Sequence, residues 1–227
     1  MGPLNPWLAG APSPVSNNLD AVRLYLKEII SSKKYFGDVR SSNSEEDVVY
    51  SLHNVPENRS LSIQLLDTDI IGTYDLYTCF AFLVLGRGKD DRLRMVVSHA
   101  DDRAFVTDFK DQLEQLRKEG FRQMTVVISA NTSSRSRWEV ERLLGQLKND
   151  QSIRLYVWNR PADSKAAFIA TNKGVSHVVV QVKRKKAPLS LEQYGESDVQ
   201  ETLSFEEPGA SSPVMASRFK TAATILG

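Results

Sequence analysis

The chain has 227 residues, 41% hydrophobic and 25% charged, which is enough for one domain with a core of its own. Its 29 basic and 28 acidic residues leave a net charge of +1, so there is no electrostatic basis for binding nucleic acid or an anionic membrane surface. No apolar run approaches the ~20 residues that cross a bilayer, and the start of the chain lacks the basic-then-apolar order of a secretory signal.

The N-terminal region is expected to form an extended arm followed by a helix. Residues 1–18 are rich in Pro, Gly, Asn and Ser, which favour irregular structure. Apolar side chains then recur at helical spacing over residues 19–29. Residues 41–47 predict a loop, and the alternation of apolar side chains over residues 61–65 predicts a strand.

The middle of the chain predicts a hairpin, followed by alternating helices and strands. Two β-rich runs, residues 78–85 and 93–98, flank a segment rich in Gly and Asp. Further segments follow at the period of a helix (residues 105–116 and 138–147) or as apolar strand-like runs (residues 124–129, 153–158 and 175–182). This order predicts an α/β sandwich, in which helices pack on a mixed, largely antiparallel sheet.

Cys79, the only cysteine, lies in the first of the two hairpin runs. If the hairpin is centred on Lys89, Cys79 falls directly opposite His99, with Cβ atoms about 4.5–5.5 Å apart on the same face. A slip of one residue would separate them, so this prediction depends on the register. One cysteine also excludes an internal disulfide, which fits a reducing compartment and a cytoplasmic site of action.

A thiol beside an imidazole has a recognised chemistry. A free thiol, with a pKa near 8.5, is mostly protonated at neutral pH, and an adjacent imidazole can take its proton and stabilise the thiolate. The imidazolium can then return the proton to a leaving group, which suits the hydrolysis of an amide. The competing interpretation is a non-catalytic binding module, in which Cys79 packs in the core and His99 caps the next helix.

The segment from Thr73 to His99 resembles the CheD-like amidohydrolases. These include the chemoreceptor glutamine deamidase CheD, the cytotoxic necrotizing factor catalytic domains, the Burkholderia lethal factor and the N-terminal asparagine amidohydrolases. The resemblance lies in a Thr six residues before the Cys, a His 20 residues after it, and the order of the elements downstream. It covers about residues 61–182.

This resemblance implies an activity and a set of site residues. Cys79 would be the nucleophile, His99 the base and then the acid, and Thr73 would orient His99. The reaction implied is deamidation of a side chain in a protein substrate, with Gln favoured over Asn. An N-terminal asparagine amidohydrolase is the alternative within the same superfamily. Tyr77 and Thr78, which flank the Cys, are the candidates for lining the substrate pocket.

The chain departs from the CheD pattern at two loops. Ser129, Ala130 and Asn131 stand where CheD carries a Gly-Gly pair, and residues 160–164, beginning with Arg160, replace a second glycine-rich loop. These loops border the active site in the family, so the substrate protein stays open. The enzyme is expected to act as a bacterial effector or toxin delivered into a host cell, or as a regulator of its own cell.

The remaining candidates are weaker. His177 is interpreted as an ordinary strand histidine, and His53 lies in a predicted loop with no partner in view. One Cys and three scattered His give no spacing typical of a zinc site, so no metal and no other cofactor is expected. We assign residues 19–186 to a deamidase-like catalytic domain and residues 187–227 to a C-terminal extension that is partly linker-like. The oligomeric state stays open.

Overall fold

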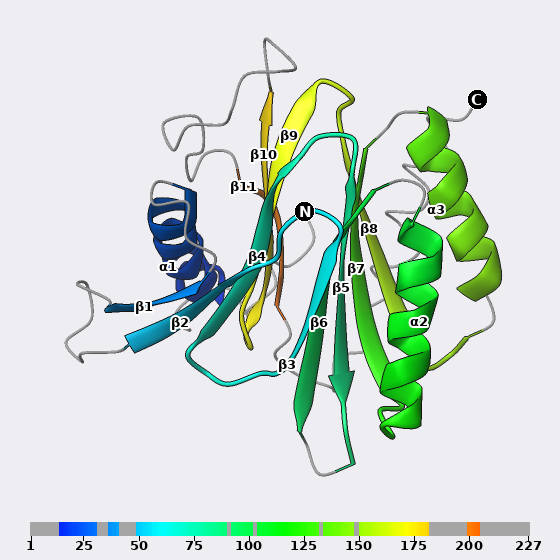
Figure 1. The fold of residues 1–227 in the computed structure, drawn as a ribbon, viewed down its shortest axis with the longest axis horizontal. Coiled ribbons are helices and arrows are strands. Elements are labelled where there is room, and N and C mark those ends of the chain that lie inside the picture. Colours follow the sequence, from blue (N-terminus) through cyan, green and yellow to red (C-terminus); the bar gives the residue numbers. More distant parts are fainter. Residues whose placement is uncertain are drawn as a thin grey trace, which may run out of the picture.

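The computed structural model describes residues 14–30, 36–40, 49–89, 92–101, 104–131, 134–147, 150–181 and 199–204. Within these residues two β-sheets face one another, and helices cover both outer faces (Figure 1). The first sheet runs in the order β1 (Phe36–Arg40), β2 (Val49–Asn54), β4 (Asp69–Leu76), β9 (Ser164–Ala170), β10 (Gly174–Gln181) and β11 (Val199–Ser204). The second runs in the order β3 (Arg59–Gln64), β6 (Leu93–Ala100), β5 (Phe80–Arg87), β7 (Gln123–Asn131) and β8 (Ile153–Arg160).

The helices form the two outer layers. Helix α1 (Pro14–Tyr25) continues into the π-helical segment η2 (Leu26–Ile30) and lies on the outer face of the first sheet. Helices α2 (Phe105–Lys118) and α3 (Ser134–Leu147) lie side by side on the outer face of the second sheet (Figure 1). None of the described helices is long and apolar enough to cross a bilayer.

Three apolar layers follow from this arrangement. Strand β5 lies between two of them, which explains why its sequence is a continuous apolar run. Phe80, Phe82 and Val84 point to α2 and α3, whereas Ala81 and Leu83 point into the layer between the sheets. A strand that is buried on both faces has no polar side to alternate with. The predicted fold class, an α/β sandwich that is mixed but largely antiparallel, is confirmed: β2–β4 and β7–β8 are the parallel pairs.

Two elements extend past the predicted boundaries of the catalytic domain, which stay a prediction. Helix α1 begins at Pro14, inside the segment expected to be an extended arm. Strand β11 lies within the predicted C-terminal extension, yet it pairs with β10 at the edge of the first sheet. Strands β1 and β2 were not predicted. Residues 1–13, 182–198 and 205–227, which hold the rest of the arm and of the extension, lie outside the described residues.

The register of the β5–β6 hairpin corrects the predicted pairing of Cys79. His99 lies opposite Ala81, not opposite Cys79, and Phe80 lies opposite Ala100. The reason is the turn: the Gly88 N–H donates to the Arg92 carbonyl at 2.9 Å, so the hairpin is centred one residue later than Lys89. Moving the partner strand by two residues keeps Cys79 and His99 on the same face, as diagonal neighbours instead of a direct pair.

Gly72 lets α1 approach the first sheet, and replacing it tests this packing. A Cβ at Gly72 would lie 2.8 Å from the Phe168 carbonyl oxygen and 2.9 Å from the Tyr25 ring. We expect Gly72→Ala to lower the free energy of unfolding by roughly 1–3 kcal/mol, measured by urea denaturation. Gly145→Ala in α3 is the matched control, since nothing lies within 4 Å of its added Cβ. There the helix propensity of Ala should raise stability by about 0.5–1 kcal/mol, and equal stability of both variants would contradict the packing.

Candidate active site

The layer between the sheets is apolar along most of its length and becomes polar at one end. Two facing rows of residues mark the change, one in each sheet. In the second sheet the row is His99, Ala81 and Ser129, and in the first it is Thr73, Phe168 and His177. Two hydrogen bonds join these rows across the layer, so the polar end is held by both sheets at once.

The first of these bonds joins Thr73 and His99. Thr73 Oγ1 lies 2.8 Å from His99 Nδ1, and both side chains are buried, at 0% and 4% exposed. His99 Nε2 is also buried and has no hydrogen-bond partner within the described residues. With the proton on Nδ1 donated to Thr73, Nε2 presents a lone pair that the protein leaves unused. The structure therefore brings together two of the three residues that the sequence singled out.

Cys79 lies in a bend at residues 77–79, between β4 and β5, which we call the Cys79 bend. Its side chain is 8% exposed and packs in the layer between the sheets, on the same side as His99. The thiol donates a hydrogen bond to Glu57 Oε1 at 3.3 Å, in the turn between β2 and β3. Glu57 was not predicted, because it is 22 residues away in sequence and no local pattern marks it.

The environment sets the protonation states of both groups. Burial raises the pKa of Cys79 to about 12, and the hydrogen bond and negative charge of Glu57 act in the same direction. Burial lowers the pKa of His99 to about 4, and the positive charge of Arg160 adds to this. Near pH 7 the site therefore holds a neutral thiol and a neutral imidazole. The resting thiolate–imidazolium pair considered from the sequence is not the state that this environment favours.

The turn that carries Glu57 is fastened to the end of β6. Asn58 has a positive φ of 58°, a conformation that Asn tolerates better than most residues. Its N–H donates to the His99 carbonyl at 2.7 Å, and its side-chain oxygen accepts from the Asp101 N–H at 3.2 Å. Glu57 is thus held beside the thiol by the same strand end that supplies the histidine.

A fully buried arginine lies beneath the Cys79 bend. Arg160, the last residue of β8, donates to the carbonyls of Tyr77 at 3.2 Å and of Cys79. It also donates to Ser129 Oγ at 2.9 Å, and Asn131 Nδ2 donates to the Tyr77 carbonyl at 2.9 Å. The carbonyl of Tyr77 thus holds the bend in place, and the prediction that the side chains of Tyr77 and Thr78 line a substrate pocket stays a prediction.

His177 is part of this arrangement and not a simple strand histidine. Its Nε2 lies 2.9 Å from Ser129 Oγ, and its ring stacks on Trp158 with centroids 5.4 Å apart. Burial lowers the pKa of His177 to about 3, with the charge of Arg160 acting in the same direction, so the ring is neutral. The neutral ring then accepts a hydrogen bond from the Ser129 hydroxyl, while Ser129 Oγ accepts one from Arg160. His53 lies elsewhere, 3.3 Å from Asp69.

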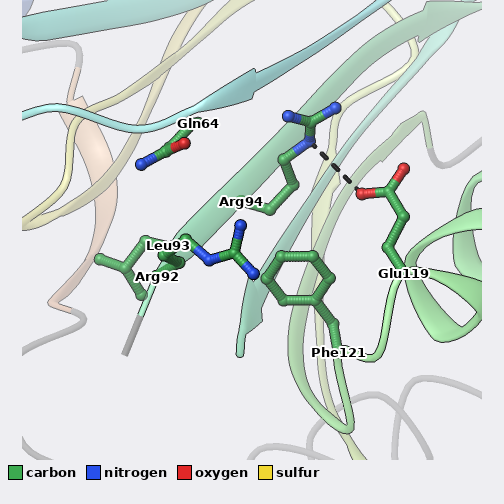
Figure 2. Close-up of a pocket in the computed structure, with 6 residues that line it drawn as sticks. All are labelled: Gln64, Arg92, Leu93, Arg94, Glu119 and Phe121. Atoms are coloured by element: carbon green, nitrogen blue, oxygen red, sulfur yellow. Dashed lines mark ion pairs between the residues drawn. The ribbon is translucent and has the colours of Figure 1, made fainter. Parts of the chain in front are cut away.

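A surface hollow lies at the opposite end of the β5–β6 hairpin (Figure 2). It measures about 240 Å³ and is lined by Gln64, Arg92, Leu93, Arg94, Glu119 and Phe121. Arg94 and His99 are both on β6, five residues apart, which corresponds to about 17 Å along a strand. The hollow is therefore separate from the polar end of the layer. No three metal-ligating side chains gather within the part of the chain that the structure describes.

Comparison with known proteins finds little. No protein-family model matches the chain, and no curated protein matches it in sequence. Among solved structures, the C-terminal domain of CNFy from Yersinia pseudotuberculosis matches with a TM-score of 0.33 and 7% sequence identity, over 75% of this chain and 72% of that one. A likeness this weak says nothing about a reaction of this chain, so any argument for an activity has to come from the side chains around Cys79.

The Glu57 contact generates a test of the thiol environment. Glu57→Gln removes the negative charge that raises the pKa of Cys79, so more thiolate is present at any given pH and alkylation by iodoacetamide should be severalfold faster at pH 8–9. Glu114→Gln, an exposed carboxylate on α2, makes the same change of charge away from the site and should leave the rate unchanged. Equal rates in the two variants would show that Glu57 does not control the thiol.

Proposed function

We propose that this protein is a cysteine-dependent amidohydrolase that deamidates a side chain of a protein substrate, with Gln favoured. The observation that carries the proposal is the buried His99, whose Nδ1 is fixed by Thr73 at 2.8 Å while its buried Nε2 has no partner within the described residues. Leaving a buried nitrogen without a partner costs about 1–3 kcal/mol. Transfer of a proton to and from this nitrogen, on the face of the sheet that also carries Cys79, would explain why the nitrogen is left without a partner.

In the first half of the reaction Cys79 is acylated. Sγ attacks the carboxamide carbon as its proton passes to His99 Nε2, and the carbonyl π electrons move to the oxygen, which becomes an oxyanion. His99 then gives the proton to the amide nitrogen, the C–N bond breaks, and ammonia leaves a thioester behind. The backbone N–H of Cys79 is the proposed donor to the oxyanion.

In the second half water releases the product. A water molecule loses its proton to His99 Nε2 and adds to the thioester carbon, which forms a second oxyanion. When this collapses, the C–S bond breaks, the sulfur takes the proton back from His99, and a side-chain carboxylic acid is formed, which ionises near pH 7. The net reaction consumes one water and converts an amide into a carboxylate and an ammonium ion, since ammonia takes up the proton that the acid releases.

The pKa values of the two groups suit this order of events. Because burial and Glu57 raise the pKa of Cys79 to about 12 and burial lowers that of His99 to about 4, little thiolate exists before the substrate arrives. Proton transfer therefore accompanies attack instead of preceding it. A histidine with so low a pKa is a weak base but a strong acid once protonated, so binding of the substrate has to bring the two pKa values closer before Sγ loses its proton, after which the imidazolium readily protonates the amide nitrogen.

Two observations favour other functions. The Glu57 carboxylate, 3.3 Å from the thiol, would attract a cation beside the scissile amide, such as the α-ammonium of an N-terminal Asn. This supports an N-terminal asparagine amidohydrolase as the second candidate. The raised pKa and deep burial of Cys79 are also what a purely structural thiol shows, which supports a non-catalytic binding module.

Deamidation in a cell extract tests the proposed reaction. Wild-type protein should add about one dalton to a Gln in a partner protein, read by mass spectrometry, and Cys79→Ser should abolish the change. His99→Asn should slow it by about 10²–10⁴-fold through loss of the base, and Thr73→Val should slow it less, through loss of the orienting contact. His53→Asn is the matched control and should retain activity, because His53 contacts Asp69 outside the site.

The same experiment separates the candidates. A change confined to chain termini would replace the internal Gln by an N-terminal Asn as the substrate. Full activity in Cys79→Ser would exclude the thioester, and no change with any extract would leave the binding module as the better account. Extracts from a host cell and from the producing organism distinguish a delivered effector from an internal regulator.

A further inference from the structure

Two neighbouring strands of the second sheet end beneath the Cys79 bend. Ser129 and Asn131 end β7, and Arg160 ends β8, the neighbouring parallel strand. In the register of that pair Asn131 lies directly opposite Arg160. Polar side chains from both strand ends therefore contact the backbone next to the proposed nucleophile.

Arg160 contacts the Cys79 bend at two carbonyls. Its Nη2 donates to Tyr77 and Cys79, and Asn131 Nδ2 donates to the Tyr77 carbonyl as well, at 2.9 Å. A guanidinium is a planar fork, and here Nη2 holds the two carbonyls while Nη1 holds Ser129, which together fix the orientation of the guanidinium and of the peptides that it contacts. The bend is therefore fastened from below on both sides of Thr78.

The arginine is itself held rigidly. Its Nη1 donates to Ser129 Oγ at 2.9 Å, and Ser129 lies 2.9 Å from His177 Nε2. The His177 ring stacks on Trp158, so this series of contacts runs from one sheet to the other. Arg160 is 0% exposed. Removing a cation from water is expensive, and well-packed apolar side chains stabilise a core at least as well, so stability alone is a poor reason for Arg160 at this place.

The two held carbonyls belong to the peptides on either side of the one that carries the Cys79 N–H, the proposed oxyanion donor. In a trans peptide the N–H points away from the C=O, and the described residues contain no cis peptide. Because the Tyr77 carbonyl points down to Arg160 and Asn131, the N–H of Thr78 points to the opposite, exposed side. Burial raises the pKa of Cys79 to about 12 and lowers that of His99 to about 4; the positive charge of Arg160 opposes the first shift and adds to the second.

We propose that Arg160 is a positioning residue of the active site, which holds the Cys79 bend in its reactive shape through the carbonyls of Tyr77 and Cys79. Ser129, and behind it His177, fix the arginine, and Asn131 supports the same bend. The proposal rests on the proposed function for the role of Cys79, whereas the contacts themselves do not depend on any activity.

Arg160→Lys tests the proposal, because lysine keeps the charge and loses the fork. Arg154→Lys, on the exposed face of the same strand, is the matched control. We expect amide hydrogen exchange of residues 77–79 to accelerate by about five- to tenfold in Arg160→Lys, with exchange of β5 and β7 unchanged. Because lysine cannot hold both carbonyls, the Cys79 thiol should move relative to Glu57, so the pH profile of Cys79 alkylation should shift although the charge is kept. For deamidation, kcat should fall while KM stays near its wild-type value. Arg154→Lys should match wild type in every measurement.

Exchange and alkylation in Arg160→Lys that match those of Arg154→Lys would overturn the proposal. If Arg160→Lys does not fold, Ser129→Ala serves instead, since it keeps the arginine and removes its support; a smaller acceleration confined to residues 77–79 is expected. Uniform acceleration across all strands would show that the arginine serves stability alone. A wild-type protein with no deamidase activity would contradict the proposed function and leave the exchange and alkylation results to decide on Arg160.

Discussion

The hydrogen bond between Thr73 and His99 joins the two sheets at the polar end of the layer between them. Thr73 belongs to the first sheet and His99 to the second, so neither residue reaches its partner unless the two sheets pack in the observed register. Immediately after Thr73 the β4–β9 pairing is interrupted, and Asp75 takes a positive φ of 62° while pairing with the buried Lys165 at 2.6 Å. This irregularity lets the chain leave the first sheet and enter β5 through the Cys79 bend. The position of the thiol therefore depends on a strained residue of the strand that also supplies the threonine.

Burial in this layer decides the chemistry as much as the identity of the residues does. A thiol and an imidazole in water would titrate on either side of neutrality, whereas here desolvation moves their pKa values apart, to about 12 and about 4. The charged groups nearby act on this balance in opposite senses: Glu57 raises the pKa of the thiol and Arg160 lowers it. Without substrate the thiol is therefore neutral and hydrogen-bonded to Glu57. We expect a substrate that displaces this contact to free Sγ for attack. If Cys79 is the proposed nucleophile, its neutral thiol would resist oxidation and unselective alkylation until the substrate binds.

Local patterns in the sequence predicted the layers of the fold well and the contacts of the site only in part. The apolar run around Phe82 and the periodic helix from Phe105 predicted their elements because both faces of β5 and one face of α2 are buried. The face shared by Cys79 and His99 follows from the two-residue period of strands. Whether they pair directly depends on the turn, and no local rule located its hydrogen bond from Gly88 to Arg92.

Glu57 and Arg160 approach Cys79 from 22 and 81 residues away, so only the packing of the two sheets brings them there. The edge strand β11 carries few apolar residues and gave no signal.

The central claim is that Cys79 is a nucleophile that His99 serves as a base, and covalent trapping tests it most directly. A chloroketone that mimics the glutamine side chain would be incubated with the protein, and the adduct would be followed by intact mass and located by peptide mapping. The account predicts a single adduct on Cys79, with a rate that saturates as the reagent fills the site and that falls in His99→Asn but not in His53→Asn. Alkylation that rises linearly with reagent concentration and is unaffected by His99→Asn would show that Cys79 is a structural thiol, and would contradict the account.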